Sequence, residues 1–319
     1  MFEKKSHIHF IGIGGISMSA IAEILKQAGH TVSGSDSSAS VVTQRLIERG
    51  IPVYIGHRAE QISDADMIVY TAAIHSDNPE LAAAKAKGIP TYERCTVLGE
   101  LMKSYRYPIL VSGTHGKTTT TSMLTTVFLE AETDPTVLVG GTLSDIDGNL
   151  RIGADTYFIS EACEYVESFL SFFPYLAIIL DVEEDHLDYF RDLDHIISAF
   201  HRFGALVPNE GAVVVNGDDK NALAAVRGLS CNIITAGLDT KNDYYATDIT
   251  FDERACACFS ICGPDDEKTS VQLSVPGMHN VSNALCAYAA ARRFGLSPDA
   301  IARGLKRFGG ADRRFQYKG

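Results

Sequence analysis

Short apolar runs alternate with amphipathic segments along most of the chain. The most apolar runs are predicted to be buried strands, at residues 7–11, 67–70, 108–111, 175–180 and 212–216. After the first run, Ile16, Ala20 and Ile24 fall on one face of a predicted helix, and Gly29 ends that helix. Strands that alternate with helices in this way predict an α/β fold with a mostly parallel sheet.

The pattern changes in the last third of the chain. Residues 246–251, 255–262 and 270–275 alternate between apolar and polar positions and are separated by turn residues. Such spacing predicts short antiparallel strands, which form a small subsheet beside the parallel core. Two further helices are predicted after them, at residues 279–294 and 297–306.

A chain of 319 residues exceeds one ordinary domain, and we predict two. The first, at about residues 1–104, starts with a strand, a glycine turn and a helix, as a Rossmann-like nucleotide-binding domain does. The second, at residues 105–319, starts with a strand and a phosphate loop. We therefore expect it to be a P-loop domain with a mostly parallel central sheet.

The strongest candidate for a phosphate site is the segment SGTHGKTTTT, directly after the strand at residues 108–111. Gly113 and Gly116 let backbone N–H groups approach phosphate oxygens, and the helix start adds a partial positive charge. Lys117 is expected to contact phosphate oxygens and Thr118 a magnesium ion. The general motif has a longer gap between its glycines, so an ordinary strand-to-helix turn with a solvent-facing lysine is the alternative.

A second phosphate turn is predicted at the start of the chain. Gly12, Gly14 and Gly15 follow the first strand, and Asp36 ends the next one. A dinucleotide site would have a third glycine where Ser17 stands, so we predict only a ligand that carries a diphosphate. Asp36 either binds a ribose or base of that ligand or caps the following turn.

Other loops of the first domain are expected to line the same crevice, because ligands bind at the carboxyl ends of parallel strands. Thr71, Ala72 and Asn78 follow the strand at residues 67–70 and are expected to face the ligand of Gly14. Asn78 also suits the N-cap of a helix that starts at a proline, and the two roles do not exclude each other.

Acidic residues follow two strands of the second domain. Glu161 comes after the strand at residues 156–160 and lies level with the phosphate loop if the strands are parallel. A carboxylate there can hold magnesium, and a solvated strand-end acid is the alternative. His186 stands in the acidic segment EEDHLDYF and is a second metal candidate, although a lone histidine is more often structural.

One helix face offers groups for a nucleobase. His279, Asn280 and Asn283 are expected to share a face at the start of the helix at residues 279–294. Two amides and an imidazole suit a purine, whereas Asn280 alone would also suit a helix cap.

The balance of 28 basic and 40 acidic residues gives a net charge of −12, which argues against nucleic acid or an anionic membrane as the main partner. The seven cysteines are scattered, as in a reducing cytosol. Cys256, Cys258 and Cys262 share one strand face, and no histidine or fourth cysteine completes a metal pattern.

The start of the chain superficially resembles a signal peptide, because Lys4 and Lys5 precede an uncharged run. Glycines interrupt that run where a signal peptide has a continuous helix. No other run approaches the length of a membrane span. We therefore predict a cytoplasmic protein without membrane insertion.

Taken together, several motifs resemble the Mur ligases over essentially the whole chain. In order they are GIGGISMSA, GSD, TAAIHSDNPE, SGTHGKTTTT, EACEYVESF, EEDHLDYF, GMHNVSNALCA and FGGADRRFQ. The short glycine gap of GTHGKT is the form found in that family. The resemblance is greatest to the members that add L-alanine. It implies that ATP phosphorylates the carboxylate of UDP-N-acetylmuramate and that the amine of L-alanine then attacks the acyl phosphate.

The resemblance also implies roles for individual residues. Lys117, Glu161 and His186 would be catalytic; Thr118 and Glu161 would hold a first magnesium, and His186 would help to hold a second. The ATP site would comprise Gly113, Thr114, His115, Gly116, Lys117, Thr118, Thr119, His279, Asn280, Asn283 and Arg314. The UDP-sugar site would comprise Gly12, Gly14, Gly15, Ser17, Asp36, Thr71, Ala72, Asn78 and Glu164.

The chain departs from the family pattern in two places. Cys163 stands where many members have an aspartate, between Glu161 and Glu164. The family has a third, Rossmann-like domain after the RRF segment, and this sequence stops at Gly319. On that basis we expect binding of UDP-N-acetylmuramate but poor ligation of L-alanine.

Three alternatives stay open. Within the family, a recycling ligase attaches a tripeptide to the same UDP-sugar. An NAD-dependent dehydrogenase would use the first domain, but Ser17 disfavours it and it leaves GTHGKTTTT unexplained. The third alternative is a nucleotide-binding module without catalytic activity. The sequence makes no prediction of the oligomeric state.

Overall fold

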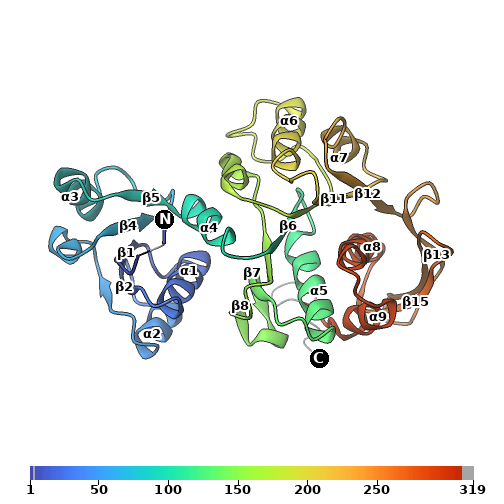
Figure 1. The fold of residues 1–319 in the computed structure, drawn as a ribbon, viewed down its shortest axis with the longest axis horizontal. Helices are drawn as coiled ribbons and strands as arrows, with labels where there is room; N and C mark the ends of the chain where they lie inside the picture. Colours follow the sequence, from blue (N-terminus) through green and yellow to red (C-terminus); the bar gives the residue numbers. More distant parts are fainter. Residues whose placement is uncertain (3, 311–319) are drawn as a thin grey trace. The chain divides into compact units, whose positions relative to one another are not determined.

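The computed structural model describes residues 1–2 and 4–310 and divides into two compact units, Met1–Leu101 and Met102–Gly319. Each unit has its own β-sheet (Figure 1). The predicted α/β class is confirmed in both units. Among the described residues, no helix is both long enough and apolar enough to cross a membrane.

The first unit alternates strands and helices. Its elements are β1 (His7–Ile11), α1 (Ile16–Gln27), β2 (Thr31–Asp36), α2 (Val41–Glu48), β3 (Val53–Ile55), the 3-10 helix η1 (Ala59–Ile62), β4 (Met67–Tyr70), α3 (Pro79–Lys87), β5 (Thr91–Glu93) and α4 (Arg94–Met102). All neighbouring strands are parallel, in the order β3-β2-β1-β4-β5. The order reverses direction beside β1, which is where such sheets bind ligands.

The two faces of this sheet differ in polarity. Ile8 and Phe10 of β1 are fully buried on one face, and α1 and α2 pack against each other. His9 points to the other face, where its ring contacts Glu80 of α3. Right-handed crossovers account for this division, because the chain returns across the sheet after β3 and continues on the opposite side.

The second unit is larger. Its strands are β6 (Tyr107–Ser112), β7 (Thr136–Leu143), β8 (Gly148–Arg151), β9 (Tyr157–Glu161), β10 (Leu176–Ile179), β11 (Ala212–Asn216), β12 (Asn232–Gly237), β13 (Tyr244–Phe251), β14 (Cys256–Cys262) and β15 (Lys268–Pro276). Its helices are α5 (Lys117–Glu130), η2 (Ser144–Ile146), η3 (Tyr165–Ser171), α6 (Leu193–Gly204), α7 (Lys220–Ala225), α8 (Met278–Arg293) and α9 (Pro298–Arg307).

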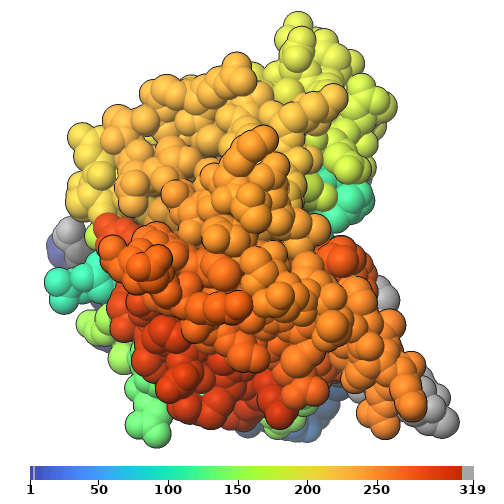
Figure 2. Space-filling view, turned by 90° about the vertical axis from the view of Figure 1, so that its right-hand side faces the viewer, coloured from blue at the N-terminus to red at the C-terminus, as the bar shows by residue number. Residues whose placement is uncertain are grey.

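These strands form one sheet in the order β15-β14-β13-β12-β11-β10-β6-β9-β7-β8. The strands from β13 to β7 are parallel, and antiparallel strands occupy both ends. The predicted antiparallel strands are therefore an extension of the main sheet, curling around α8 and α9 (Figure 1). Figure 2 shows the face that these strands and the last two helices present. The antiparallel pair β7–β8 at the other edge was not predicted.

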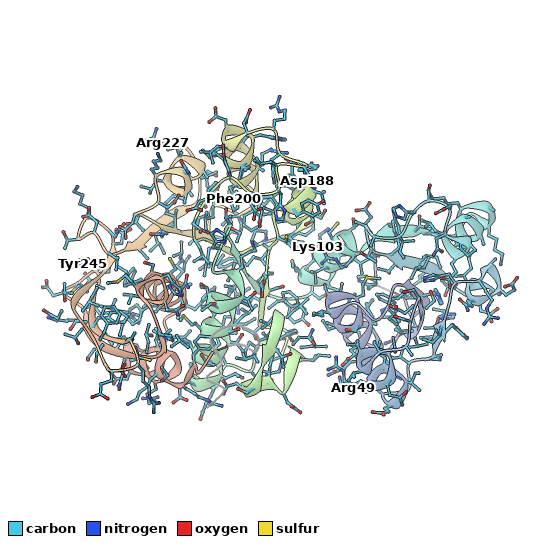
Figure 3. The ribbon with its side chains drawn as sticks, turned by 180° about the vertical axis from the view of Figure 1, so that it is seen from behind. Arg49, Lys103, Asp188, Phe200, Arg227 and Tyr245 are labelled. Atoms are coloured by element: carbon cyan, nitrogen blue, oxygen red, sulfur yellow. The ribbon has the colours of Figure 1, made fainter. Side chains whose placement is uncertain are left out.

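The largest core lies between this sheet and the helices α5, α8 and α9. Helix α9 packs so closely against α5 that a Cβ on Gly304 would lie 2.5 Å from the Cα of Val127. On α6, the fully buried Phe200 (Figure 3) and Phe203 pack against Phe169. Packing on both faces fixes the strands whose carboxyl ends carry the site described next.

Candidate functional site

The phosphate loop connects β6 to α5 and is fixed to the chain that leaves β10. The backbone N–H groups of Thr114 and His115 donate to the main-chain oxygen and the carboxylate of Asp181, at 3.1 and 2.8 Å. Gly113 and Gly116 have φ angles of +143° and +80°, a region that favours glycine. A Cβ on Gly113 would lie 2.8 Å from the Asp181 carboxylate. The loop conformation therefore requires both glycines.

Lys117 lies over this loop. Its Nζ donates to the main-chain oxygen of Gly113 at 2.5 Å and to the two carboxylate oxygens of Glu164 at 2.9 and 3.1 Å. Its side chain is 17% exposed, unlike the solvent-facing lysine of an ordinary turn. Gly116 provides no side-chain cap for α5, so the N–H groups of the first turn can bind an anion. The cation and the helix start together suit a phosphate.

Thr118 and Glu161 meet at the end of β9. The Thr118 hydroxyl donates to Glu161 Oε2 at 3.1 Å, and the N–H of Gly140 on β7 donates to Glu161 Oε1 at 2.6 Å. A Cβ on Gly140 would lie 2.9 Å from both carboxylate oxygens, so the absent side chain leaves a cradle for the carboxylate. Hydroxyl and carboxylate oxygens are ligands that magnesium prefers. This pair fits a magnesium ion.

A second group of metal-ligating side chains lies beside Lys117. One donor atom each from Glu164, Asp185 and His186 lies within 4.8 Å of the others. His186 Nε2 is 3.6 Å from Glu164 Oε1 and 3.8 Å from Asp185 Oδ2. Two carboxylates and an imidazole can ligate a divalent cation. Asp185 was not among the predicted site residues, although it lies in the predicted acidic segment.

The segment that carries Glu164 has an unfavourable backbone conformation. Val166 and Glu167 have φ angles of +48° and +56°, which a β-branched residue rarely adopts. Contacts from α6 hold the segment: the Glu167 carboxylate accepts a hydrogen bond from Arg202 and lies 3.5 Å from His195 Nε2. Backbone strain of this kind persists only where the surroundings enforce it, and it is common at functional sites.

Asn280 and Asn283 are buried at the start of α8. The Asn283 amide donates to Asn280 Oδ1 at 3.2 Å, and the Asn280 amide donates to a main-chain oxygen of β15 at 2.8 Å. A Cβ on Gly116 would lie 2.8 Å from Asn283 Oδ1, so Asn283 borders the phosphate loop. Gly277 and not Asn280 is the N-cap of α8, and His279 is exposed. The structure therefore brings two of these three predicted side chains together beside the loop.

The threonines of α5 have different environments. Thr118 contributes to the site and Thr119 is half-buried. The hydroxyls of Thr120 and Thr121 are buried, and no hydrogen-bond partner for them exists in the part of the chain that the structure describes. The predicted ATP residue Arg314 lies outside the described residues.

The carboxyl group of Asp181 is held in an environment that disfavours its charge. Burial raises its pKa, and the hydrogen bond from the N–H of His115 offsets this only in part. The negative charges of Glu183 and Asp219 raise it further. Asp181 fixes the conformation of the phosphate loop through its hydrogen bonds, and it was not among the predicted site residues.

In the first unit, the glycine turn is tied to the end of β2. The N–H groups of Gly12 and Ile13 donate to the main-chain oxygen of Ser35 at 2.8 and 2.9 Å. The N–H of Gly14 donates to Asp36 Oδ2 at 2.8 Å. Asp36 Oδ1 also accepts from the N–H two residues later, at 3.3 Å. Asp36 therefore caps the following turn and orients the glycine turn at once.

Of the other residues predicted for this crevice, Thr71 lies beside the glycine turn. A Cβ on Gly12 would meet the Thr71 methyl at 3.1 Å, so the loop after β4 borders the glycine turn. Ala72 is exposed, and Ser17 accepts a hydrogen bond from Arg94 at 3.1 Å. Asn78 is the N-cap of α3, accepting from two backbone N–H groups of its first turn.

Comparisons with known proteins agree with this geometry. A family model described as "Mur ligase family, catalytic domain" matches residues 7–106, and one described as "Mur ligase middle domain" matches residues 111–291. The chain belongs to the Mur ligase family. This result confirms the resemblance seen in the motifs.

Curated Mur ligases resemble the chain over nearly its whole length. A UDP-N-acetylmuramate–L-alanine ligase of Acetivibrio thermocellus is 54% identical over 99% of this chain and 68% of its own length. One from Agathobacter rectalis is 53% identical over 100% of this chain and 70% of its own length.

Solved structures give the same fold. A UDP-N-acetylmuramate–alanine ligase from Thermotoga maritima has a TM-score of 0.85 and 30% identity, over 98% of this chain and 70% of that one. A UDP-N-acetylmuramate:L-alanyl-gamma-D-glutamyl-meso-diaminopimelate ligase from Neisseria meningitides has a TM-score of 0.87 and 29% identity, over 97% of this chain and 100% of that one. The fold is thus common to ligases with different acceptors.

Proposed function

We propose that this Mur ligase joins L-alanine to the carboxylate of UDP-N-acetylmuramate with consumption of ATP, in the synthesis of peptidoglycan precursors. The observation that carries the proposal is the 54% identity over 99% of the chain to a ligase of that name. The phosphate loop, with Lys117 above it and Thr118 beside Glu161, supplies the groups that phosphoryl transfer requires.

The second unit, about residues 105–319, holds ATP in this proposal. The loop from Gly113 to Gly116 binds phosphate through its backbone, and Lys117 moves from Glu164 to the phosphates. Thr119, His115 and the α8 residues His279, Asn280 and Asn283 complete the nucleotide site. The burial of both asparagines beside the loop supports a role in binding the base.

Thr118 and Glu161 would hold one magnesium ion, and His186, with Glu164 and Asp185, a second. Bound there, the ions would supply charge neutralisation for phosphoryl transfer. The chain's own contribution is to fix the ligands: Gly140 orients Glu161, and Glu164 accepts from Lys117. Because charge accumulates at the transferred phosphoryl group, this electrostatic arrangement lowers the barrier.

The reaction has two steps. A carboxylate oxygen of the muramoyl group attacks the γ-phosphorus, and the bond to the leaving ADP oxygen breaks. The amine nitrogen of L-alanine then attacks the acyl carbon, phosphate leaves with the bonding electrons, and the nitrogen loses a proton to give the amide. Lys117 stabilises negative charge in the first step.

The first unit, about residues 1–104, holds the UDP-sugar in this proposal. The turn of Gly12, Gly14, Gly15 and Ser17 binds the diphosphate, and Asp36, Thr71, Ala72 and Asn78 surround it. The hydrogen bond from Gly14 to Asp36 supports this site, because it presents the turn in a fixed conformation.

No disulfide joins any of the cysteines in the described part of the chain, which supports a reducing, cytoplasmic location.

Calorimetric titration with UDP-N-acetylmuramate tests the substrate, and hydroxylamine trapping of the acyl phosphate tests the first step. We expect tight binding of the UDP-sugar and hydroxamate formation that depends on ATP, magnesium and UDP-sugar. Lys117→Ala should lower ATP affinity or hydroxamate formation at least about 100-fold, since a charge-assisted contact in the transition state is lost. Absence of UDP-sugar binding by the wild-type chain would overturn the proposal.

A second candidate is the tripeptide-adding activity. The structural match to the Neisseria ligase, at a TM-score of 0.87, is as good as the match to the alanine-adding enzyme. Competition between L-alanine and L-alanyl-γ-D-glutamyl-meso-diaminopimelate for the trapped acyl phosphate separates the two. Preferential capture by the tripeptide would favour the second candidate.

A further inference from the structure

A buried carboxylate that the proposed mechanism does not use lies under the UDP-sugar crevice. Glu80, in the first turn of α3, is 0% exposed. Its Oε1 lies 3.1 Å from His9 Nε2 of β1. Its Oε2 accepts from the Ser35 hydroxyl of β2 at 2.5 Å and lies 2.8 Å from His57 Nδ1, after β3. One side chain thus joins four segments of the first unit.

The line of polar contacts continues from His9 across the sheet. His9 Nδ1 lies 2.8 Å from the Ser33 hydroxyl, which also lies 2.8 Å from His7 Nε2. His7 Nδ1 lies 2.8 Å from the main-chain oxygen of Asp64. The chain therefore runs from Asp64 through two imidazoles and one hydroxyl to Glu80, with contacts of hydrogen-bond length throughout.

The number of protons that this line of contacts needs does not depend on the tautomers of its histidines. Both ends accept only, since a carbonyl oxygen and an ionised carboxylate have no proton to donate. The line has a contact at each end and two at Ser33, and each contact needs one proton. Neutral His7, Ser33 and His9 supply one proton each, so one of the four contacts has no proton between its two atoms. One additional proton on the two imidazoles completes the line and balances the charge of Glu80.

The surroundings of Glu80 are consistent with an ionised carboxylate. Burial raises its pKa, but the hydrogen bonds with His9, Ser35 and His57 outweigh this, and the net effect lowers it. Besides His57, which lies 2.8 Å from Glu80 Oε2, Tyr54 of β3 is an ionisable group against this line, and its ring stacks on His9 with centroids 6.3 Å apart.

The far end of the line reaches solvent. His7 lines a cavity of about 410 Å³ together with Tyr54, Arg58, Glu60 and Asp64, and its backbone N–H donates to the Asp66 carboxylate at 2.8 Å. Arg58, Glu60, Asp64 and Asp66 are thus the charged residues around His7 in the described part of the chain. The additional proton can therefore exchange with water at His7, although Glu80 itself is buried.

Hydrogen bonds also connect Glu80 to the residues of the proposed UDP-sugar crevice. Ser35 donates its hydroxyl to Glu80, and its main-chain oxygen accepts from the glycine turn at Gly12. The backbone N–H of Glu80 donates to Asn78 Oδ1 at 3.0 Å. Displacement of Glu80 would consequently move the glycine turn and the Asn78 side chain, both of which the proposed function places at the UDP-sugar.

We propose that Glu80 is a positioning residue of the UDP-sugar crevice and that the crevice keeps its binding geometry only while His7 and His9 share one additional proton. The inference rests on the proposed function for its ligand. Without that proton, two lone pairs face each other in one contact, and the contacts that hold Ser35 and α3 are weakened. Affinity for the UDP-sugar then falls.

Glu80→Gln is a nearly isosteric test. The glutamine amide donates to His9 Nε2, and its oxygen accepts from Ser35 and His57, so neutral histidines complete every contact. The variant should therefore fold and bind, but without the additional proton. Glu48→Gln, on the exposed side of α2, removes one carboxylate outside the line and is the matched control.

The measurement is calorimetric titration of the full chain with UDP-N-acetylmuramate from about pH 6 to about pH 9. The diphosphate diester and the carboxylate of this probe stay ionised throughout, and its uracil starts to lose a proton only at the upper end, equally for every variant. The difference in slope between the variants therefore reports on the protein. We expect affinity to fall about tenfold toward high pH in the wild type and in Glu48→Gln, and to stay level in Glu80→Gln. An equal slope in Glu80→Gln would overturn the positioning role.

Imidazole ¹⁵N NMR of the same proteins reads the proton directly. We expect one doubly protonated ring shared by His7 and His9 in the wild type and two neutral rings in Glu80→Gln. Two neutral rings in the wild type at the acidic end would overturn the buried proton. If the wild type bound no UDP-sugar, the proposed function and the positioning role would both fall, while the NMR spectra would still decide the proton count.

Discussion

Replacing Gly140 by alanine tests the proposed magnesium site without changing any of its proposed ligands. The added Cβ would lie 2.9 Å from both carboxylate oxygens of Glu161 and 3.1 Å from its Cδ. Ordinary contact requires the carboxylate to move by roughly 0.5 Å. That movement lengthens the 2.6 Å hydrogen bond from Gly140 to about 3.1 Å and displaces the carboxylate from its place beside Thr118.

The magnitude follows from the displaced ligand. A charge-assisted contact is worth about 1.5–3 kcal/mol, so loss of one such contact between Glu161 and a bound ion corresponds to roughly 10- to 100-fold in affinity. Gly140 is exposed on β7, and the atoms that a Cβ would meet belong to the end of the Glu161 side chain. Without the ion only one hydrogen bond is weakened, so the free energy of unfolding should fall by about 1 kcal/mol or less.

The assay is calorimetric titration with ATP in the presence and absence of magnesium. Gly140→Ala should lose affinity about 10- to 100-fold with magnesium and little without it. Gly309→Ala is the matched control, because a Cβ there meets nothing within 4 Å. A magnesium-dependent gain in affinity equal to that of the wild type would refute the argument that the position of Glu161 matters.

Two further substitutions test the loops around this site. Asp181→Asn should raise the free energy of unfolding at neutral pH: the raised pKa of Asp181 means that stability is lost as the pH rises from its unfolded-state pKa, near 3.9, through the folded one. Thermal unfolding across this range measures the difference, and equal curves for both proteins would contradict it. Val166→Gly should stabilise the chain by about 1 kcal/mol, because glycine accepts the φ of +48° without strain. A lower melting temperature would show that the valine side chain contributes more than the strain costs.

Most of the fold could be predicted because its signals are local. The strand at His7–Ile11 and the strand at Met67–Tyr70 were predicted to the residue, since apolar runs end at glycine or polar turns. The strand at Asn232–Gly237 was not predicted. It is only partly buried and lacks a continuous apolar run, and its place depends on pairing with β11.

The residues of the candidate site also differ in whether a local sequence signal predicts them. Lys117, Thr118 and Glu161 could be predicted as site residues because they stand in recognisable motifs at the ends of strands, and the structure brings Thr118 and Glu161 into contact. Gly140 was missed because its role depends on the approach of β7 to the end of β9, which no local pattern reports. The proton shared by His7 and His9 depends on Glu80, far along the chain, and on strand register.

Each unit is one unbroken stretch of sequence and completes its own sheet. A gene segment that ends near Leu101 therefore carries every strand of the first sheet. Exchange of that segment between related genes would transfer the proposed UDP-sugar site in one piece and leave the loop from Gly113 to Gly116 unchanged. The contiguous layout would therefore let recombination, as well as point substitution, change one proposed site while the other is kept.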